Sequence, residues 1–344
     1  MSGDGGNPPS LRDLLGAYEK SGLGACYAVK EGDKFYFKDA SVLRFRPTKA
    51  VDTRFIQHIF KTDHVQRQIH AGSGSTVGTY TISRAKETRI LLPPLEEQKR
   101  IAKILDAADA LLAKRRESLA QLDALMQSTF LGLFGDPVKN EKGWDKVDIG
   151  NIARAKPNNG VFRKNDEYTE RDGFGVPVVW LEELFKGSKI DVTNARRLPL
   201  ESKEVAKYGL NYGDILFCRS SLKLDGIAYN NVYLGEDKAA AFECHLIRVS
   251  PDLNECDPIF LSAQLRTPPL RACLKSVSKT STMTTIDQKA ISGISVIVPP
   301  MEIQSKFARF SASVDLQKEK IRIAIGELDS LFLSLQQKAF SGGI

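Results

Sequence analysis

Two stretches of the chain carry apolar residues at the spacing of an amphipathic helix. Between residues 99 and 136 most charged residues lie off an apolar stripe, and between residues 299 and 341 apolar residues recur every seven positions. A seven-residue period is typical of a coiled-coil seam. We predict long helices over 93–136 and 299–341 that pack antiparallel, with a seam formed by Ile104, Leu111, Leu122, Leu125, Phe307, Val314, Ile321, Leu328 and Leu335. The alternative is an ordinary core helix in each domain.

Both stretches begin with the same motif. Residues 93–98 read Pro-Pro-Leu-Glu-Glu-Gln and residues 299–304 read Pro-Pro-Met-Glu-Ile-Gln, at an offset of 299 − 93 = 206. Proline and glutamate both suit the first turn of a helix. Further upstream, Asp13-Leu14-Leu15 matches Asp214-Ile215-Leu216 more weakly. A repeat this long predicts two copies of a globular module, each followed by a helix.

The segment between the two helices has a different pattern. Short β-rich runs at 176–180, 214–218, 245–249 and 294–298 are separated by turns rich in glycine, asparagine, aspartate and serine. This pattern predicts a mixed α/β domain, and the whole chain is expected to be of the α+β class. We place the domain boundaries at 1–92, 93–136, 137–298 and 299–341.

Composition narrows the functional classes only a little. The chain has 344 residues and a formal net charge of +7, which permits an acidic partner such as nucleic acid. Its five cysteines include no Cys-x-x-Cys pair, so we expect free thiols in a reducing compartment. No run approaches the length of a membrane span and no signal core is present, so we predict a soluble, cytoplasmic protein without a membrane partner.

Motifs for catalysis are mostly absent. Asn7-Pro8-Pro9 resembles part of a methyltransferase motif, but Ser10 stands where an aromatic residue is needed, and residues 72–78 match no phosphate-loop spacing. His58, His64, His70 and His245 are expected to be surface or core residues, because no metal-ligand spacing surrounds them. We therefore predict no catalytic residue, no metal and no cofactor.

Three polar loops offer the residue types that bind phosphates or base edges. We take as DNA-binding candidates Arg154, Lys156, Asn158, Asn159, Arg163 and Lys164 in the first loop, Arg219, Ser220 and Lys223 in the second, and Lys275 and Lys279 in the third. Solvated loops on a balanced surface are the alternative. Two modules held apart by a rigid spacer favour two separate reading heads on double-stranded DNA.

The combination of repeated motifs resembles the specificity subunit of type I restriction-modification systems. The residues concerned are the two Pro-Pro motifs, the ending Phe134-Gly135-Asp136-Pro137 and the run Gly213-Asp214-Ile215-Leu216. The resemblance implies two target-recognition domains that each read half of a split DNA site. It also implies an antiparallel coiled coil that holds two methyltransferase subunits, with restriction motor subunits as further partners, and no catalytic residues of its own.

One departure from the family concerns the first module. The second module has about sixty-five residues before its Gly-Asp-Ile-Leu run, whereas the first has only about a dozen before Asp13. The first target-recognition domain is therefore expected to be partial, through a different start site, a truncated gene or a half supplied by another chain. A coiled-coil scaffold that binds partner subunits without reading DNA is the alternative function, and a nuclease or methyltransferase acting alone is a third.

Overall fold

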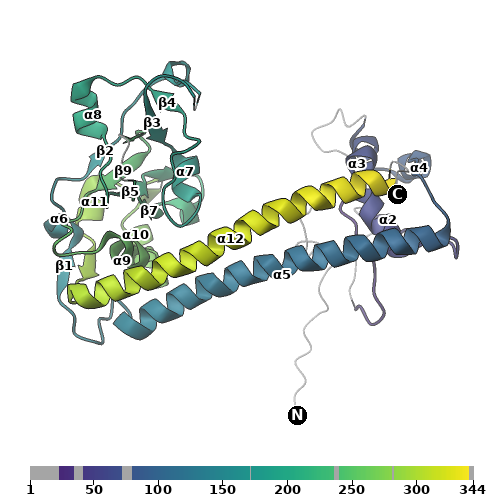
Figure 1. The fold of residues 1–344 in the computed structure, drawn as a ribbon, viewed down its shortest axis with the longest axis horizontal. Coiled ribbons are helices and arrows are strands. Elements are labelled where there is room, and N and C mark those ends of the chain that lie inside the picture. Colours follow the sequence, from purple (N-terminus) through teal and green to yellow (C-terminus); the bar gives the residue numbers. More distant parts are fainter. Residues whose placement is uncertain are drawn as a thin grey trace, which may run out of the picture. The chain divides into compact units, whose positions relative to one another are not determined.

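The two long helices are confirmed. In the computed structural model, α5 runs from Leu95 to Phe134 and α12 from Met301 to Phe340 (Figure 1). Contacts divide the chain into two units, and the division falls inside both helices. Unit 1 comprises residues 1–118 and 322–344, and unit 2 comprises residues 119–321. The four-domain division drawn from the sequence stays a prediction.

The structure describes residues 23–34, 42–71, 80–170, 172–235, 240–280 and 283–340. The motifs at residues 7–9, 13–15 and 72–78 lie outside these ranges. No helix among the described residues is long and apolar enough to cross a membrane.

The glutamine of the first Pro-Pro motif joins α5 to unit 1. The Gln98 side chain accepts a hydrogen bond from the backbone N–H of Asp52 (2.8 Å) and donates to the carbonyls of Pro93 (2.7 Å) and Ala50 (3.2 Å). Asp52 in turn caps α2 (Thr53–Phe60) by accepting from the N–H of Phe55. Because Gln98 is buried, each of these bonds satisfies a group that water does not reach.

The second motif repeats this joint in unit 2. Gln304 accepts from the N–H of Asp257 (2.9 Å) and donates to the carbonyls of Pro299 (2.7 Å) and Glu255 (3.2 Å). Asp257 caps α9 (Pro258–Leu265). Helix α9 begins 258 − 53 = 205 residues after α2, so the repeat seen in the sequence is also a repeat of elements.

Unit 1 is a small helical core around the first part of α5 and the last part of α12. The other helices that the structure describes in this unit are α2, α3 (Asp63–His70) and α4 (Ile82–Glu87). The buried apolar residues are Phe55, Ile56, Ile59, Val65, Ile69, Ile101, Ala102 and Leu105, and from α12 Phe332, Leu335, Ala339 and Phe340 pack against them. The Phe55 and Phe340 rings meet edge to face, 5.3 Å apart between centroids.

A polar cluster fixes α2 to α5 inside unit 1. Asp106 on α5 accepts two hydrogen bonds from Arg54 (2.7 and 3.1 Å) and one from Nε2 of His58 (2.8 Å). Burial raises the pKa of the Asp106 carboxyl, but the bonds from Arg54 and His58 outweigh it, and the pKa is lowered overall. The cluster therefore favours the charged carboxylate.

All the strands that the structure describes lie in unit 2. Its central sheet has the order β2-β9-β5-β7 and is antiparallel throughout, with strands Asn158–Asn159, Leu246–Val249, Ile215–Cys218 and Asn230–Val232. A second sheet, β4-β3-β8, joins Arg197–Leu198, Val176–Val179 and Ala241–Phe242. A two-stranded pair, β1 and β12, joins Lys146–Asp148 and Ser295–Ile297. All four β-rich runs of the sequence therefore form strands.

Short helices lie between the strands along the chain. They are α6 (Ile149–Ile152), η2 (Asn165–Glu167), α7 (Leu181–Phe185), α8 (Ser202–Tyr208), η3 (Leu224–Gly226), α9, α10 (Pro268–Ser276) and α11 (Gln288–Ser292). The core continues into the long helices through four rings, Phe130 and Phe134 of α5, Phe260 of α9 and Phe307 of α12. Together with Lys318–Asp123 in unit 2 (2.6 Å) and Arg116–Asp329 in unit 1 (3.6 Å), these contacts make the helix pair antiparallel.

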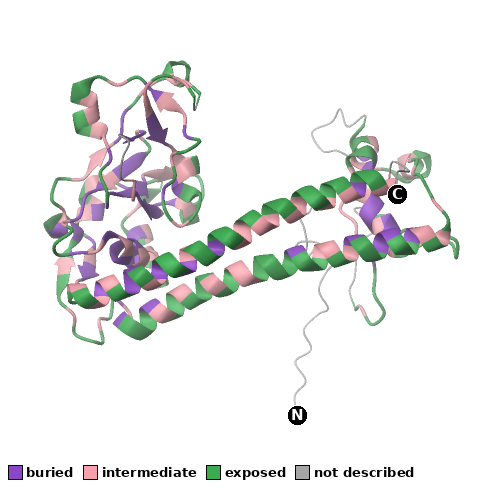
Figure 2. Cartoon of the chain, in the orientation of Figure 1, coloured by how far each residue is buried: buried purple, intermediate pink, exposed green. Residues whose placement is uncertain are grey.

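The predicted seam is wrong in phase along α5. Phe307 and Val314 are buried, and Leu122, Ile321, Leu328 and Leu335 are half-buried, but Ile104, Leu111 and Leu125 are exposed. Leu105 and Leu112 are buried instead, one position further on. Figure 2 shows that most of α5 is exposed or half-buried. In the adjacent pairs Ile104/Leu105 and Leu111/Leu112 of α5, only the second member of each pair is buried. A seven-residue period alone does not say which member that is.

Candidate nucleic-acid interface

A small three-stranded ribbon brings together the second and third polar loops. It has the order β10-β11-β6, with strands Lys279–Thr280, Thr284–Thr285 and Ser220–Ser221. The register places Thr285 between Ser220 and Lys279, and the neighbouring row places Thr284 between Ser221 and Thr280. Thr284 is buried and Thr285 is exposed, so the row Ser220–Thr285–Lys279 faces outward.

Cationic and polar side chains surround this outward row. Arg219 precedes β6, and its side chain donates one hydrogen bond, to the carbonyl of Cys244 (3.3 Å). Its guanidinium has further N–H groups for a partner. Ser220 Oγ lies 2.9 Å from Nδ1 of the exposed His245. Lys279 is 83% exposed and lies 3.6 Å from Asp287, a distance at which the solvent weakens the pair.

The remaining lysines of these two loops, Lys223 and Lys275, differ in whether they form an ion pair. Lys223 is exposed and makes no ion pair with any described residue. Lys275 on α10 is instead held by Asp225 of η3, 2.6 Å away. Hydroxyls, an imidazole, an arginine and free lysines on a β-ribbon are groups that bind phosphates and base edges.

Three DNA-binding candidates of the first polar loop also make contacts within unit 2. Asn158 accepts from Arg248 (3.1 Å), Asn159 accepts from Gln288 (2.9 Å), and Arg163 forms ion pairs with Glu204 and Glu167. These bonds join the loop to the rest of unit 2, and the role of the loop in DNA binding stays a prediction.

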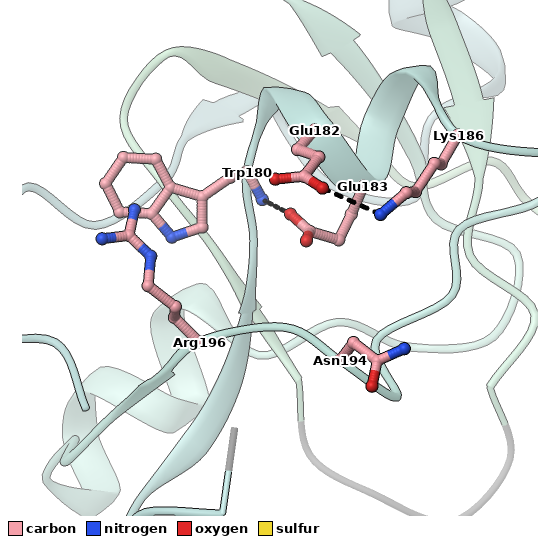
Figure 3. Close-up of a pocket in the computed structure, with 6 residues that line it drawn as sticks. All are labelled: Trp180, Glu182, Glu183, Lys186, Asn194 and Arg196. Carbon is pink, nitrogen blue, oxygen red and sulfur yellow. Dashed lines mark hydrogen bonds and ion pairs between the residues drawn. The ribbon is translucent and has the colours of Figure 1, made fainter. Parts of the chain in front are cut away.

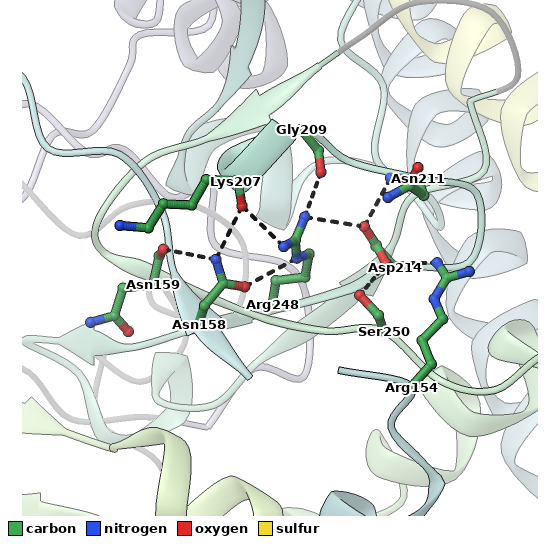
Figure 4. A network of polar contacts seen from close by, with 9 residues as sticks. All are labelled: Arg154, Asn158, Asn159, Lys207, Gly209, Asn211, Asp214, Arg248 and Ser250. Atoms are coloured by element: carbon green, nitrogen blue, oxygen red, sulfur yellow. Dashed lines mark hydrogen bonds and ion pairs between the residues drawn. The ribbon is translucent and has the colours of Figure 1, made fainter. Parts of the chain in front are cut away.

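Arg154 belongs to the same internal network, centred on Asp214 (Figure 4). Asp214 is fully buried and accepts from Ser250 Oγ (2.6 Å) and the N–H of Asn211 (2.8 Å). Arg154 and Arg248 lie 3.4 and 3.8 Å from its two oxygens. Burial lowers the pKa of the Arg248 guanidinium, and Asp214 opposes this shift. The run Gly213-Asp214 in the sequence therefore marks a structural centre.

Lys156 and Lys164 are the two residues of the first loop that stay available. Both are exposed, and neither makes an ion pair within the part of the chain that the structure describes. Two lysines without a fixed geometry suit phosphate contacts better than base reading, because their ammonium groups act as point charges.

An arginine outside the predicted loops lies beside a small cavity. Arg196 stacks on the Trp180 ring, with its guanidinium carbon 4.1 Å from the centroid, and lies 5.3 Å from the Tyr168 centroid. The cavity of about 180 Å³ is lined by Trp180, Glu182, Glu183, Lys186, Asn194 and Arg196 (Figure 3). Burial, with Glu243 and Cys244 nearby, raises the pKa of Tyr168 to about 12, so the stack keeps a neutral phenol.

Sequence reasoning missed Arg196, Thr285 and His245. Arg196 and Trp180 are sixteen positions apart (196 − 180 = 16) on different elements, so no local pattern connects them. Thr285 and His245 gain their place from pairing with β6, which only the folded sheet shows.

Comparisons with known proteins agree with this architecture. A family profile described as the type I restriction modification DNA specificity domain matches residues 23–123. The chain is 26% identical to the StySPI type I specificity subunit of Salmonella potsdam and 24% identical to the EcoKI specificity subunit of Escherichia coli K12, covering 86% of this chain in each case. It spans about two thirds of their length, 66% and 67%.

Solved structures show the same fold. The type I restriction-modification S subunit from M. genitalium is matched with a TM-score of 0.53 at 17% identity, covering 85% of this chain and 73% of that one. A chain from a study of complex assembly and conformational transition of the type I R-M system is matched with a TM-score of 0.52 at 19% identity, covering 86% and 73%. Two repeated joints, two long antiparallel helices and mixed α/β sheets define an S-subunit-like fold. The chain is similar in sequence and in fold to the specificity subunits of type I restriction-modification systems.

Proposed function

We propose that this protein is a DNA-sequence-recognition subunit that directs methyltransferase and endonuclease subunits to a bipartite site on double-stranded DNA. It has no catalytic role of its own in this proposal and works in the cytoplasm. The observation that carries the proposal is the outward row Ser220–Thr285–Lys279, with Arg219 and His245 beside it. The major groove of B-form DNA admits a two-stranded β-ribbon, and the hairpin of β10 and β11 is an element of that kind.

The long helices supply the second half of the proposal, a surface for partner subunits. Ile104, Leu111 and Leu125 of α5 are exposed, as are Leu316, Ile323, Leu331 and Leu333 of α12. Exposed apolar residues in such number are typical of a protein interface. Two methyltransferase subunits are the proposed partners on these helices, with restriction motor subunits joining through them.

Selection from a pool of random-sequence duplexes tests DNA reading directly. The full chain is assayed alone and with its modification subunit, and the enriched duplexes are sequenced. A shared half-site or split site is the expected result. Retention of DNA without enrichment would show general phosphate binding only.

The alternative function, a scaffold that binds partner subunits without reading DNA, is supported by the same exposed helix residues. It predicts a different result in this experiment. A scaffold would bind the modification subunit and yield no enriched sequence with or without it. A chain that instead methylated or cleaved DNA alone would contradict the non-catalytic assignment.

A further inference from the structure

Glu243, Cys244 and His245 converge on one point, although they are consecutive in the chain. They follow β8 and form a turn closed by a hydrogen bond from the N–H of Leu246 to the carbonyl of Glu243 (3.1 Å). In an extended strand neighbouring side chains point to opposite faces, but a turn removes that alternation. One carboxylate oxygen, the thiol sulfur and one ring nitrogen all lie within 4.8 Å of one another.

The Glu243 carboxylate is buried, and only one of its two oxygens accepts a hydrogen bond from a described residue. Glu243 is 2% exposed, and its Oε2 accepts from the N–H of His245 (2.9 Å). Its Oε1 is buried and has no hydrogen-bond partner among the described residues. An unpaired buried carboxylate oxygen is costly, so a ligand that binds it removes a penalty of the fold.

His245 is oriented from outside the cluster. The contact between Ser220 Oγ and His245 Nδ1 (2.9 Å) fixes the imidazole ring. When Nδ1 donates to Ser220, Nε2 carries the lone pair that a metal ion needs, an arrangement common around metal-binding histidines. Arg219 nearby adds one positive charge, which the carboxylate and a thiolate together exceed.

We propose that the turn Glu243–Cys244–His245 binds one divalent transition-metal ion of the zinc class. One oxygen, one sulfur and one nitrogen ligand suit Zn²⁺, and three protein ligands leave a fourth position for water. Binding releases the Cys244 thiol proton to solvent, because the thiolate is the ligand. This proposal departs from the expectation that no metal-ligand spacing surrounds His245, because Glu243 and Cys244 immediately precede it.

The bound ion would connect the turn to the ribbon. His245 contacts Ser220 of β6, and Arg219 contacts the carbonyl of Cys244. The metal would therefore stiffen the side of unit 2 that carries the outward row. The metal proposal itself does not depend on DNA binding, and its test has a readout of its own.

Titration of the full chain with Co²⁺, after removal of metal with a chelator, tests the site. Cobalt bound to a thiolate gives a sulfur-to-metal charge-transfer band in the near ultraviolet. We expect the band to saturate at one equivalent and to disappear when Zn²⁺ is added. No band in the wild-type chain would overturn the proposal.

Variants then assign the ligands. Cys244→Ser should abolish the band, and the matched control Cys273→Ser, a half-buried thiol on α10, should keep it. His245→Gln changes an exposed side chain and should weaken binding by at least about 10–100-fold, a loss seen even for residues that only support a ligand. This variant keeps the test decisive if Cys244→Ser disturbs the turn. A band that survives in folded Cys244→Ser would place the metal elsewhere and overturn the assignment.

Discussion

The arginines of unit 2 differ in how many of their guanidinium N–H groups are already bonded to neighbouring residues. Arg154 and Arg163 are held by carboxylates, whereas Arg219 gives one hydrogen bond to a backbone carbonyl and Arg196 lies on an aromatic ring. The sequence places Arg154, Arg163 and Arg219 in polar loops and does not single out Arg196. The partners of these arginines are up to sixty positions away, as for Arg154 and Asp214 (214 − 154 = 60). Partners so distant are set by strand pairing, so the division into structural and available arginines was not predictable.

The available arginine gives a prediction for DNA binding. If Arg219 reads a base, Arg219→Ala should cost about 1–3 kcal/mol on the selected site and relax its preference at one position, whereas Lys279→Ala should weaken all sequences together. Equilibrium binding to the selected and a scrambled duplex measures both. Arg309→Ala, an exposed residue on α12, is the matched control and should change neither.

The buried carboxylate gives a prediction for stability. Asp214→Asn leaves Arg248 without its charged partner in a buried site, and removing one partner of a buried pair costs about 3–5 kcal/mol. Urea denaturation of the full chain measures the loss. Asp225→Asn, at a side chain that is 94% exposed, should stay within about 0.5 kcal/mol of wild type. Equal midpoints for the two variants would contradict the structural role of Asp214.

At the scale of elements, sequence reasoning found the two long helices and four of the strands, but not the short helices or the phase of α5. Length, capping motifs and β-rich runs are local signals, and each of them led to an observed element. Which leucine of an adjacent pair faces the core is decided by the partner helix. The same limit applies to Gln98 and Gln304, which the motif shows but whose bonds to Asp52 and Asp257 only the folded joint reveals.

Neighbouring leucines on α5 test that phase. Leu112 is 4% exposed and Leu111 is 41% exposed. Leu112→Asp buries a charge without a partner and should lower the free energy of unfolding by at least about 3 kcal/mol, whereas Leu111→Asp should change it by about 0.5 kcal/mol or less. Thermal melts of the isolated chain compare the two. The reverse order would restore the seam predicted from the sequence.

The Arg54–His58–Asp106 cluster predicts a loss of stability in acid. The pKa of Asp106 is lower in the folded chain, so its contribution is present above the unfolded pKa and is lost as pH falls through the folded pKa. Denaturation midpoints measured from neutral to acidic pH should therefore fall less steeply for Asp106→Asn than for wild type. Parallel curves for the two proteins would exclude Asp106 as a source of the acid sensitivity.

For the whole molecule, charge is a weak guide to where DNA binds. Residues 143–298 carry 21 basic and 20 acidic residues, a net charge of only 21 − 20 = +1. Under the proposed function, attraction to DNA would therefore come from the local arrangement of Lys156, Lys164, Arg219, Lys223 and Lys279. The net charge of +7 spread over the chain could not show this arrangement.

A small number of phosphate contacts predicts a moderate dependence on salt. Three to five contacts, as these side chains permit, give a slope of log affinity against log salt of about −3 to −5. Titrations at four or more salt concentrations measure the slope, and Lys223→Ala with Lys279→Ala should reduce it by about two. A slope near zero would mean that these lysines do not meet the backbone of DNA.

Residues of α5 and of the end of α12 form the core of unit 1 together, and this predicts how the protein behaves when its backbone is cleaved within α5. Residues 113–117 in the middle of α5 are all exposed, and a backbone break there would separate residues 1–116 from the rest covalently. Phe332, Leu335 and Phe340 on the second fragment would still fill the core that Phe55 and Leu105 form on the first. The two fragments would therefore co-elute in size-exclusion chromatography as one nicked protein. They would dissociate only in denaturant.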